Sequence, residues 1–266
     1  WTFSTLGWPE KTEDLKTYHP TAILETMFDI LFFWVARMIM MTTYALGEIP
    51  FSTVYLHARV LDKDGEKMSK SKPETMINPL DVCAKYGTDA VRLSLVLGIS
   101  PGNDVRLSEE KIAGFRNFTN KLWNIGRFVL SQPKAESGRP KLVSLADKWL
   151  ILKLNRLILE VTNDLENFRF SEAGEKLREF TWNYFADWYI EINKIQSNND
   201  LLVGVYSVLL KLWHPFMPYV TEELWAANGD DGLLIIEDWP NAKWTRGIKN
   251  PEGRFNMVID LIKKIR

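Results

Sequence analysis

The sequence contains little cysteine and almost no net charge. Among its 266 residues, Cys83 is the only cysteine, and the formal net charge is −1. A lone cysteine excludes an internal disulfide and a zinc site built from several cysteines, and it fits a reducing cytosol. A nearly neutral chain does not attract nucleic acid as a whole, so any binding of a polyanion must come from local patches.

The sequence also lacks a basic start followed by an apolar core, so we find no signal peptide. Because it does not begin with methionine, we expect a piece of a longer protein. Its most hydrophobic stretch, Ile30 to Leu46, contains Arg37 and is shorter than the roughly 20 apolar residues of a membrane span. We therefore expect a buried helix at this stretch and no membrane association.

Residues 1–106 alternate between strand and helix patterns. Residues 22–25 and 53–61 are rich in β-forming residues and predict strands. Between them, a helix is expected from Asp29, as its cap, to about Ala45, with Gly47 at its exit. This order predicts a parallel sheet covered by helices, which binds ligands at the carboxyl ends of its strands.

A turn at Asp64-Gly65 follows the second strand, and two helices follow that turn. The first is expected from Pro79 to Gly87, and the second begins near Asp89.

Helical periodicity dominates the chain from residue 107 onward. Residues 107–145 predict one long helix, capped by Ser108, and then a polar linker over 131–144. Residues 146–266 predict a helical bundle. Its expected segments are 146–168, 171–196, 200–213, 216–228, a short extended return at 233–240, and a last helix over 252–266.

The segment from Lys67 to Lys72 combines three lysines, two serines and a methionine directly after a predicted strand. Lysine ammonium groups are compact charges on flexible stems and suit phosphate groups. Cations at this position stabilise the negative charge that develops during phosphoryl or adenylyl transfer. By composition alone, the alternative is a solvated surface loop.

The letters KMSKS, residues 67–71, resemble the second signature of class I aminoacyl-tRNA synthetases. FDILFFWVARMIMM, residues 28–41, is similar to the helix that valyl-tRNA synthetases carry ahead of that signature; isoleucyl enzymes differ there. Segments 3–9, 78–95, 111–128 and 214–225 resemble the same family. The resemblance implies the second half of a Rossmann-like class I catalytic domain, followed by a helical anticodon-binding domain.

For the nucleotide, the resemblance implies that Lys70 contacts the ATP phosphates and that Lys67 assists as the loop closes. Met68, Ser69 and Ser71 would order this ATP-binding loop, with Asp29 near the ribose and His57 near the adenine. Read without the family, Asp29 is a helix cap and His57 a structural histidine. No protein ligand for a metal is expected.

For the amino acid, the resemblance implies that Ile30 and Trp34 line a valine pocket; the alternative is ordinary core packing. Two departures from the family pattern stand nearby. Met27 replaces a glycine that permits close backbone approach, and Pro73-Glu74 replaces glycine-asparagine, which stiffens the end of the loop.

The long helix after Ser108 supplies the expected tRNA-binding residues. Cations bind the nucleic-acid backbone, and aromatic rings stack on unpaired bases. The candidates are Lys111, Arg116, Lys121, Trp123, Asn124, Arg127 and Phe128. The alternative places the aromatic rings in the core and leaves the cations solvated. We expect His214 to be structural.

The resemblance to valyl-tRNA synthetases implies the C-terminal half of a cytoplasmic, monomeric valine–tRNA ligase that uses ATP with Mg²⁺, valine and tRNA(Val). The histidines, His19, His57 and His214, do not form the family's first signature, H-x-G-H. We expect that signature and an editing domain upstream, and no valine activation by this chain alone. Two alternatives stay open: a non-catalytic tRNA-binding helical module and an isoleucine-specific synthetase.

Overall fold

The structure is a computed structural model that describes residues 3–68, 76–100, 102–133, 142–229, 232–242 and 252–265. The chain divides into two compact units. The first contains residues 1–68 and 99–106, and the second contains residues 69–98 and 107–266.

The first unit contains two pairs of parallel strands. Its elements are α1 (Glu13–Tyr18), β1 (Thr21–Thr26), α2 (Ala36–Leu46), β2 (Phe51–Leu56), β3 (Val60–Leu61) and β4 (Val105–Arg106). In the first pair, Thr21 lies opposite Phe51 and Thr26 opposite Leu56; in the second, Val60 lies opposite Val105. The predicted parallel pairing is confirmed.

The single strand expected over 53–61 is wrong, because the chain changes its partner in the middle. Up to Leu56 it pairs with β1. The amide of Gly102 then donates to the Leu56 carbonyl at 3.0 Å, and the amide of Val105 donates to the Arg59 carbonyl at 2.8 Å. Residues 57–59 form the crossing between the two neighbours.

The helix before β2 begins irregularly. A 3₁₀ turn, η1 (Phe28–Ile30), and a π-helical turn, η2 (Leu31–Val35), precede α2. Met27 stands at the cap position, so the expectation that Asp29 caps this helix is wrong. The exit is as expected: Gly47 adopts φ 74°, and its amide donates to the Thr43 carbonyl.

The expected burial of this helix is also wrong. Phe32 is 77% exposed and Tyr44 is 92% exposed, whereas Val35 and Thr42 are buried. Two strands offer too little surface to cover a helix of this length. By length and composition alone, residues Phe28–Leu46 could cross a membrane, with a mean hydropathy of 1.3 and only 11% of the stretch buried.

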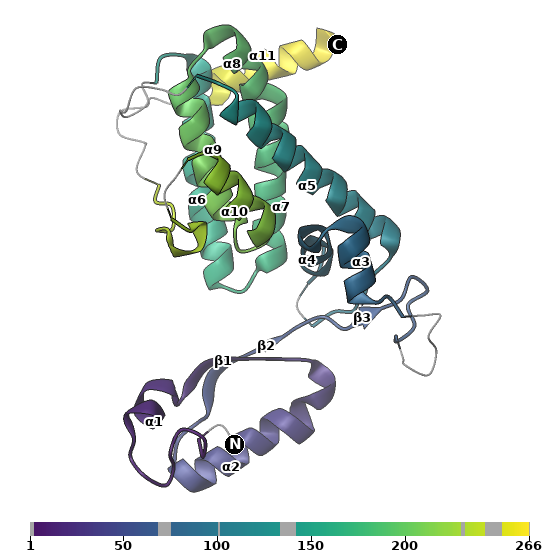
Figure 1. Ribbon diagram of the computed structural model, residues 1–266, viewed down its shortest axis with the longest axis vertical. Coiled ribbons are helices and arrows are strands. Elements are labelled where there is room, and N and C mark those ends of the chain that lie inside the picture. The colour runs from purple at the N-terminus through teal and green to yellow at the C-terminus, as the bar shows by residue number, and fades with distance from the viewer. Residues whose placement is uncertain are drawn as a thin grey trace. The chain divides into compact units, whose positions relative to one another are not determined.

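The second unit is a helical bundle, in which α6, α7 and α9 run side by side and α5 packs on α9 and α10 (Figure 1). Its helices are α3 (Pro79–Tyr86), α4 (Thr88–Val96), α5 (Glu109–Leu130), α6 (Leu145–Glu166), α7 (Phe170–Glu179), α8 (Glu191–Gln196), α9 (Asn199–Trp213), α10 (Pro218–Ala227) and α11 (Glu252–Ile265). A π-helix, η4 (Phe180–Ile190), joins α7 to α8.

Polar caps explain where the long helices begin. The Ser108 side chain accepts from the Lys111 amide at the start of α5. Ser144 and Asp147 form a capping box at the start of α6, each accepting from the other's backbone. Residues 233–240 depart from expectation: a 3₁₀ turn, η5 (Leu234–Ile236), replaces the extended return, and the Leu234 amide donates to the Glu222 carboxylate at 2.8 Å.

Helix α4 joins the bundle through polar contacts with the segment that begins α10. The Asp89 carboxylate accepts from the Val220 amide at 2.7 Å, and the Arg92 guanidinium donates to the carbonyls of Pro215 and Phe216 at 3.0 and 3.2 Å. These bonds explain why α3 and α4 group with the helices, although residues 1–106 were expected to form one catalytic portion.

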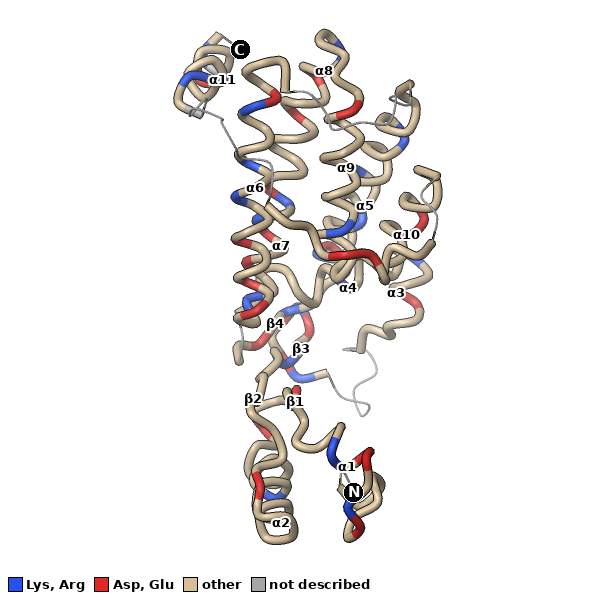
Figure 2. The backbone as a smooth tube through the Cα atoms, turned by 90° about the vertical axis from the view of Figure 1, so that its left-hand side faces the viewer, with Lys and Arg blue, Asp and Glu red and all other residues tan. Residues whose placement is uncertain are grey.

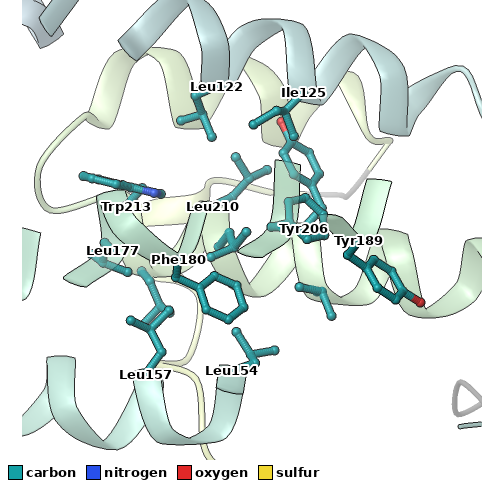
Figure 3. Close-up of a cluster of buried hydrophobic side chains, with 14 of the residues drawn as sticks. Leu122, Ile125, Leu154, Leu157, Leu177, Phe180, Tyr189, Tyr206, Leu210 and Trp213 are labelled. Atoms are coloured by element: carbon teal, nitrogen blue, oxygen red, sulfur yellow. The ribbon is translucent and has the colours of Figure 1, made fainter. Parts of the chain in front are cut away.

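The core of the second unit lies between α5, α6, α7, η4 and α9. Figure 3 shows Leu122 and Ile125 of α5 facing Leu210 and Tyr206 of α9, with Leu154 of α6 on the opposite side. The largest fully buried side chains include Trp149, Trp213, Tyr189, Tyr206 and Phe185. Among the described tryptophans, Trp149, Trp213 and Trp225 are buried in the bundle, whereas Trp8, Trp34, Trp123 and Trp182 are exposed.

Gly126 is the point of closest approach between α5 and the helices beneath it. A Cβ atom there would overlap the Tyr206 hydroxyl and lie 2.6 Å from Leu224 Cδ2. Overpacking costs about 1–3 kcal/mol, more than the about 1 kcal/mol of helix propensity that alanine offers. We expect Gly126→Ala to destabilise the bundle in urea titrations followed by circular dichroism.

Gly114 of the same helix is the matched control, because a Cβ there meets nothing within 4 Å. Gly114→Ala should raise stability by about 0.5–1 kcal/mol. Equal effects of the two substitutions would contradict the assigned packing.

Asp164 at the end of α6 is a buried carboxylate with two cations. Lys176 Nζ lies 2.6 Å from one carboxylate oxygen and Arg169 2.8 Å from the other. Burial raises the pKa of Asp164, but the two cations outweigh burial, and the net pKa is lowered. A lowered pKa stabilises the fold above the unfolded value of about 4, and this stability is lost as pH falls through the folded value.

We expect Asp164→Asn to lower the free energy of unfolding at pH 7 by about 1–3 kcal/mol and to flatten the acid limb of the stability profile. The control is Glu160→Gln, because Glu160 is 45% exposed and 3.8 Å from Lys176; it should change stability by less than about 1 kcal/mol. Parallel pH profiles for wild type and Asp164→Asn would contradict this role.

Candidate nucleotide site and nucleic-acid interface

The carboxyl ends of β1 and β2 bring two predicted site residues to one edge. β1 ends at Thr26 and is followed by Asp29; β2 ends at Leu56 and is followed by His57. The His57 amide donates to the Thr26 carbonyl at 3.0 Å. Its ring is held on both sides, with Nδ1 3.0 Å from the Ala58 carbonyl oxygen and Nε2 3.6 Å from the Glu25 carboxylate.

Arg59 organises this edge and was missed from the sequence. Its guanidinium contacts both carboxylate oxygens of Asp104, at 3.2 and 2.7 Å, and lies 3.7 Å from the Asp29 carboxylate. It also stands over the Phe28 ring at 5.5 Å. Because Asp104 is 45 residues away and belongs to no recognisable motif, no local sequence pattern predicts the ion pair between Arg59 and Asp104.

The lysine-rich loop leaves the first unit from a closed turn after β3. Lys67 forms an isolated antiparallel bridge with Leu61, its side chain is exposed, and Met68 is half-buried. The turn expected at Asp64-Gly65 is present, with Gly65 at φ 87°. The other predicted loop residues, Ser69, Lys70, Ser71 and the Pro73-Glu74 pair, lie outside the described residues.

Ile30 and Trp34 are not core residues of the first unit. Ile30 is 40% exposed and Trp34 is 44% exposed. They lie four residues apart across the π-helical turn η2, which has more residues per turn than an α-helix. The core-packing alternative is therefore wrong for both side chains among the described residues.

Metal ligands do not cluster in the described parts of the chain. No group of three or more histidine, cysteine, aspartate or glutamate side chains there is placed to hold a metal ion.

Helix α5 presents an exposed stripe of residues three or four apart. The stripe consists of Arg116, Asn120, Trp123 and Arg127. Trp123 is 38% exposed, so the expectation that it could be a core residue is wrong. Within the described residues, the Arg116 and Arg127 side chains have no ion pair. Figure 2 marks the charged positions along α5.

The other predicted tRNA-binding residues of α5 already have protein partners. Lys121 Nζ lies 3.0 Å from Asp187 and 3.5 Å from the centre of the Trp182 ring. Phe128 is half-buried, with Lys194 Nζ 5.6 Å from its ring centre. Lys121 and Phe128 flank the stripe, as does Asn124, which is exposed. Lys111 is half-buried, and its burial lowers the pKa of its ammonium group.

His214 lies in the bundle and has a structural setting. Its Nδ1 is 2.9 Å from the Thr221 hydroxyl, and its side chain is 13% exposed. This geometry agrees with the structural role expected from the sequence.

Family comparisons match both parts of the chain. The model described as "tRNA synthetases class I (I, L, M and V)" matches residues 1–108, and the model described as "Anticodon-binding domain of tRNA ligase" matches residues 147–266. The chain belongs to the class I tRNA synthetases, and the predicted resemblance is confirmed.

Within this class, the chain is similar to bacterial valine–tRNA ligases over its whole length. It is 42% identical to the enzyme of Dehalococcoides mccartyi strain CBDB1 and 43% identical to those of Pseudothermotoga lettingae and Brucella suis biovar 1. Each alignment covers 100% of this chain but only 32%, 32% and 31% of those relatives. The chain therefore spans about a third of their length.

Solved structures agree on the fold. The LeuRS–tRNA–LeuAMS ternary complex of Agrobacterium radiobacter K84 matches 87% of this chain and 29% of that chain, with a TM-score of 0.72 and 22% identity. Methionyl-tRNA synthetase of Mycobacterium tuberculosis, bound by methionyl-adenylate, matches 82% of this chain and 46% of that chain, with a TM-score of 0.62 and 21% identity. The predicted fold class, a partial Rossmann-like domain followed by a helical anticodon-binding domain, is confirmed.

Proposed function

We propose that this chain is part of a valine–tRNA ligase. In the proposed reaction, the carboxylate of valine attacks the α-phosphate of ATP, which forms valyl-adenylate and releases pyrophosphate. A ribose hydroxyl of tRNA(Val) then attacks the acyl carbon of valyl-adenylate, which forms an ester bond to valine and releases AMP. The observation that carries the proposal is the edge where Asp29 and His57 follow paired parallel strands, in a chain similar over its whole length to valine–tRNA ligases.

The lysine loop supplies positive charge in this proposal. Lys67 leaves the turn after β3 with an exposed side chain, and Lys70 follows it three residues later. ATP enters with Mg²⁺ as its substrate complex. As negative charge develops on the departing pyrophosphate, the two ammonium groups stabilise it. Met68, Ser69 and Ser71 order the loop around the phosphates.

His57 and Asp29 bind the nucleoside part of ATP. Parallel sheets bind nucleotides beyond the carboxyl ends of their strands, which is where both residues lie. The Arg59 guanidinium, 3.7 Å from Asp29, orients the Asp29 side chain so that a carboxylate oxygen can accept a hydrogen bond from a ribose hydroxyl.

Ile30 and Trp34 form the wall of the valine pocket. Both side chains are partly exposed and apolar, on the irregular helical segment that follows β1 and begins at Phe28. A rigid apolar wall distinguishes side chains that differ by one methylene group by about 1–3 kcal/mol. This wall therefore favours valine over isoleucine by excluding the larger side chain.

The α5 stripe binds tRNA(Val). Arginine guanidinium groups at residues 116 and 127 neutralise phosphates, and the exposed Trp123 ring offers a face on which an unpaired base can stack. Lys121 and Phe128 border the same surface. The intact protein acts in the cytoplasm as a monomer, where translation supplies its tRNA.

Amino-acid-dependent ATP–pyrophosphate exchange tests this function. We expect the full-length protein to exchange pyrophosphate with valine and at least tenfold less efficiently with isoleucine. We expect the 266-residue chain alone to show no valine-dependent exchange, because it contains no H-x-G-H sequence. Preference for isoleucine in the full-length protein, or normal turnover by the chain alone, would contradict the proposal.

A further inference from the structure

Asp62 lies at the base of the lysine-rich loop. It follows β3 directly and is 7% exposed. One of its carboxylate oxygens, Oδ1, accepts from two backbone amides of the next turn, that of Asp64 at 3.0 Å and that of Glu66 at 2.8 Å. A buried carboxylate is costly unless it is hydrogen-bonded, and amide donors to a charged acceptor make strong bonds.

The backbone of Asp62 closes the same turn. Its amide donates to the Glu66 carbonyl at 2.9 Å, and its carbonyl accepts from the Gly65 amide at 3.2 Å. Gly65 adopts φ 87°, a conformation that side chains with a Cβ rarely adopt, and its Cβ position is 3.2 Å from the Arg106 guanidinium. The buried Asp62 side chain and the positive φ angle of Gly65 therefore both stabilise this turn.

This turn determines where the lysine loop starts. It reverses the chain within four residues, so that Lys67 lies opposite Leu61 in an antiparallel bridge at the end of β3. The side chains of Asp64 and Glu66 are exposed, and only backbone groups of these two residues contribute to the Asp62 contacts. The hydrogen bonds of this turn thus fix the backbone position of Lys67, the first lysine of the loop.

We propose that Asp62 is a positioning residue for adenylate formation, because its carboxylate clamps the turn that presents Lys67 to the ATP phosphates. The inference rests on the proposed function of the lysine loop. A misplaced cation loses interactions that form mainly in the transition state, so the clamp acts on kcat for exchange more than on KM for ATP.

The test compares variants of the full-length protein by ATP–pyrophosphate exchange. Asp62→Ala removes the acceptor, and we expect kcat to fall by about tenfold to a hundredfold, with KM for ATP changed less than about threefold. Asp62→Asn keeps an Oδ1 acceptor and should restore kcat to within about threefold of wild type. The matched control, Asp64→Ala, should leave both constants unchanged.

A second variant, Gly65→Ala, keeps the proposal testable if Asp62→Ala does not fold. Gly65→Ala strains the same turn without touching the carboxylate and should reproduce the loss of kcat. An unchanged kcat in both Asp62→Ala and Gly65→Ala, or an Asp62→Asn variant as defective as Asp62→Ala, would overturn the proposal.

Hydrogen exchange separates this inference from the proposed function. In Asp62→Ala, we expect the amides of Asp64 and Glu66 to exchange at least tenfold faster than in wild type, measured by mass spectrometry on peptides that span 62–68. Unchanged exchange would overturn the clamp even if the protein activates valine. Faster exchange in a protein with no valine-dependent activity would contradict the positioning role together with the proposed function.

Discussion

Lys70→Ala in the full-length protein is expected to lower valine-dependent ATP–pyrophosphate exchange by about a thousandfold. The side chain is the second lysine of the KMSKS sequence, and its ammonium group would face the pyrophosphate as it leaves. Because the charge develops mainly in the transition state, kcat should fall much more than the affinity for ATP. Binding of tRNA should stay within about twofold, since the α5 stripe lies on another part of the chain.

Lys63→Ala is the matched control for Lys70→Ala. Lys63 is an exposed lysine four residues before Lys67, in the turn that precedes the signature. Its loss removes one positive charge from the same segment without altering the signature, so exchange should stay within about threefold of wild type. Equal losses for the two variants, or a parallel loss of tRNA binding in Lys70→Ala, would contradict the assigned role.

Removing the Arg127 cation and the Trp123 ring from the α5 stripe is expected to weaken tRNA binding by about a hundredfold. The double variant Trp123→Ala, Arg127→Ala deletes one stacking face, worth about 1–3 kcal/mol per base, and one phosphate contact. The slope of log K against log salt concentration should fall by about one for the lost phosphate contact. Binding would be measured by filter binding or fluorescence anisotropy at several salt concentrations, with exchange activity unchanged.

Lys121→Ala is the contrast within the same helix. Because Lys121 already pairs with Asp187 and stands over Trp182, its charge is largely committed to the protein. We expect a loss of tRNA affinity of less than about fivefold. A larger loss for Lys121→Ala than for the double variant would place the tRNA on the flank of α5 instead of on the stripe.

The sequence predicts several helix ends well because their signals are local. Ser108 and Ser144 cap long helices at the expected places, and Gly47 ends the N-terminal helix in the left-handed conformation. Pro79 begins α3 as expected. Capping and turn chemistry depend on a few neighbouring residues, so they can be deduced from one sequence without knowledge of the tertiary contacts.

The sequence predicts poorly whatever depends on distant partners. The break after Leu56 follows from the amides of Gly102 and Val105, about 45 residues later. The Arg59–Asp104 contact and the Asp89 contact with the Val220 amide also join distant segments. Exposure of Phe32 and Tyr44 is a property of the area available to cover a helix, which periodicity does not report.

Some residues of the candidate site can likewise be found from the sequence, whereas others are found only in the tertiary structure. Composition and resemblance point to the lysine loop, and only the resemblance places Asp29 and His57 near the nucleotide. The burial of Asp62 and the engagement of Lys121 by Asp187 require the tertiary structure. The shared face of Arg116, Asn120, Trp123 and Arg127 could have been read from helical periodicity, since these positions repeat every three or four residues.

Hydrogen exchange of the lysine loop in the full-length protein tests the central claim most directly. With ATP and Mg²⁺ present, we expect peptides that span residues 62–75 to become protected, and to become more protected when valine is added. A helical tRNA-binding module without nucleotide chemistry would instead show protection by tRNA on α5 alone. An unchanged rate of exchange over residues 62–75 at saturating ATP and valine would contradict the account.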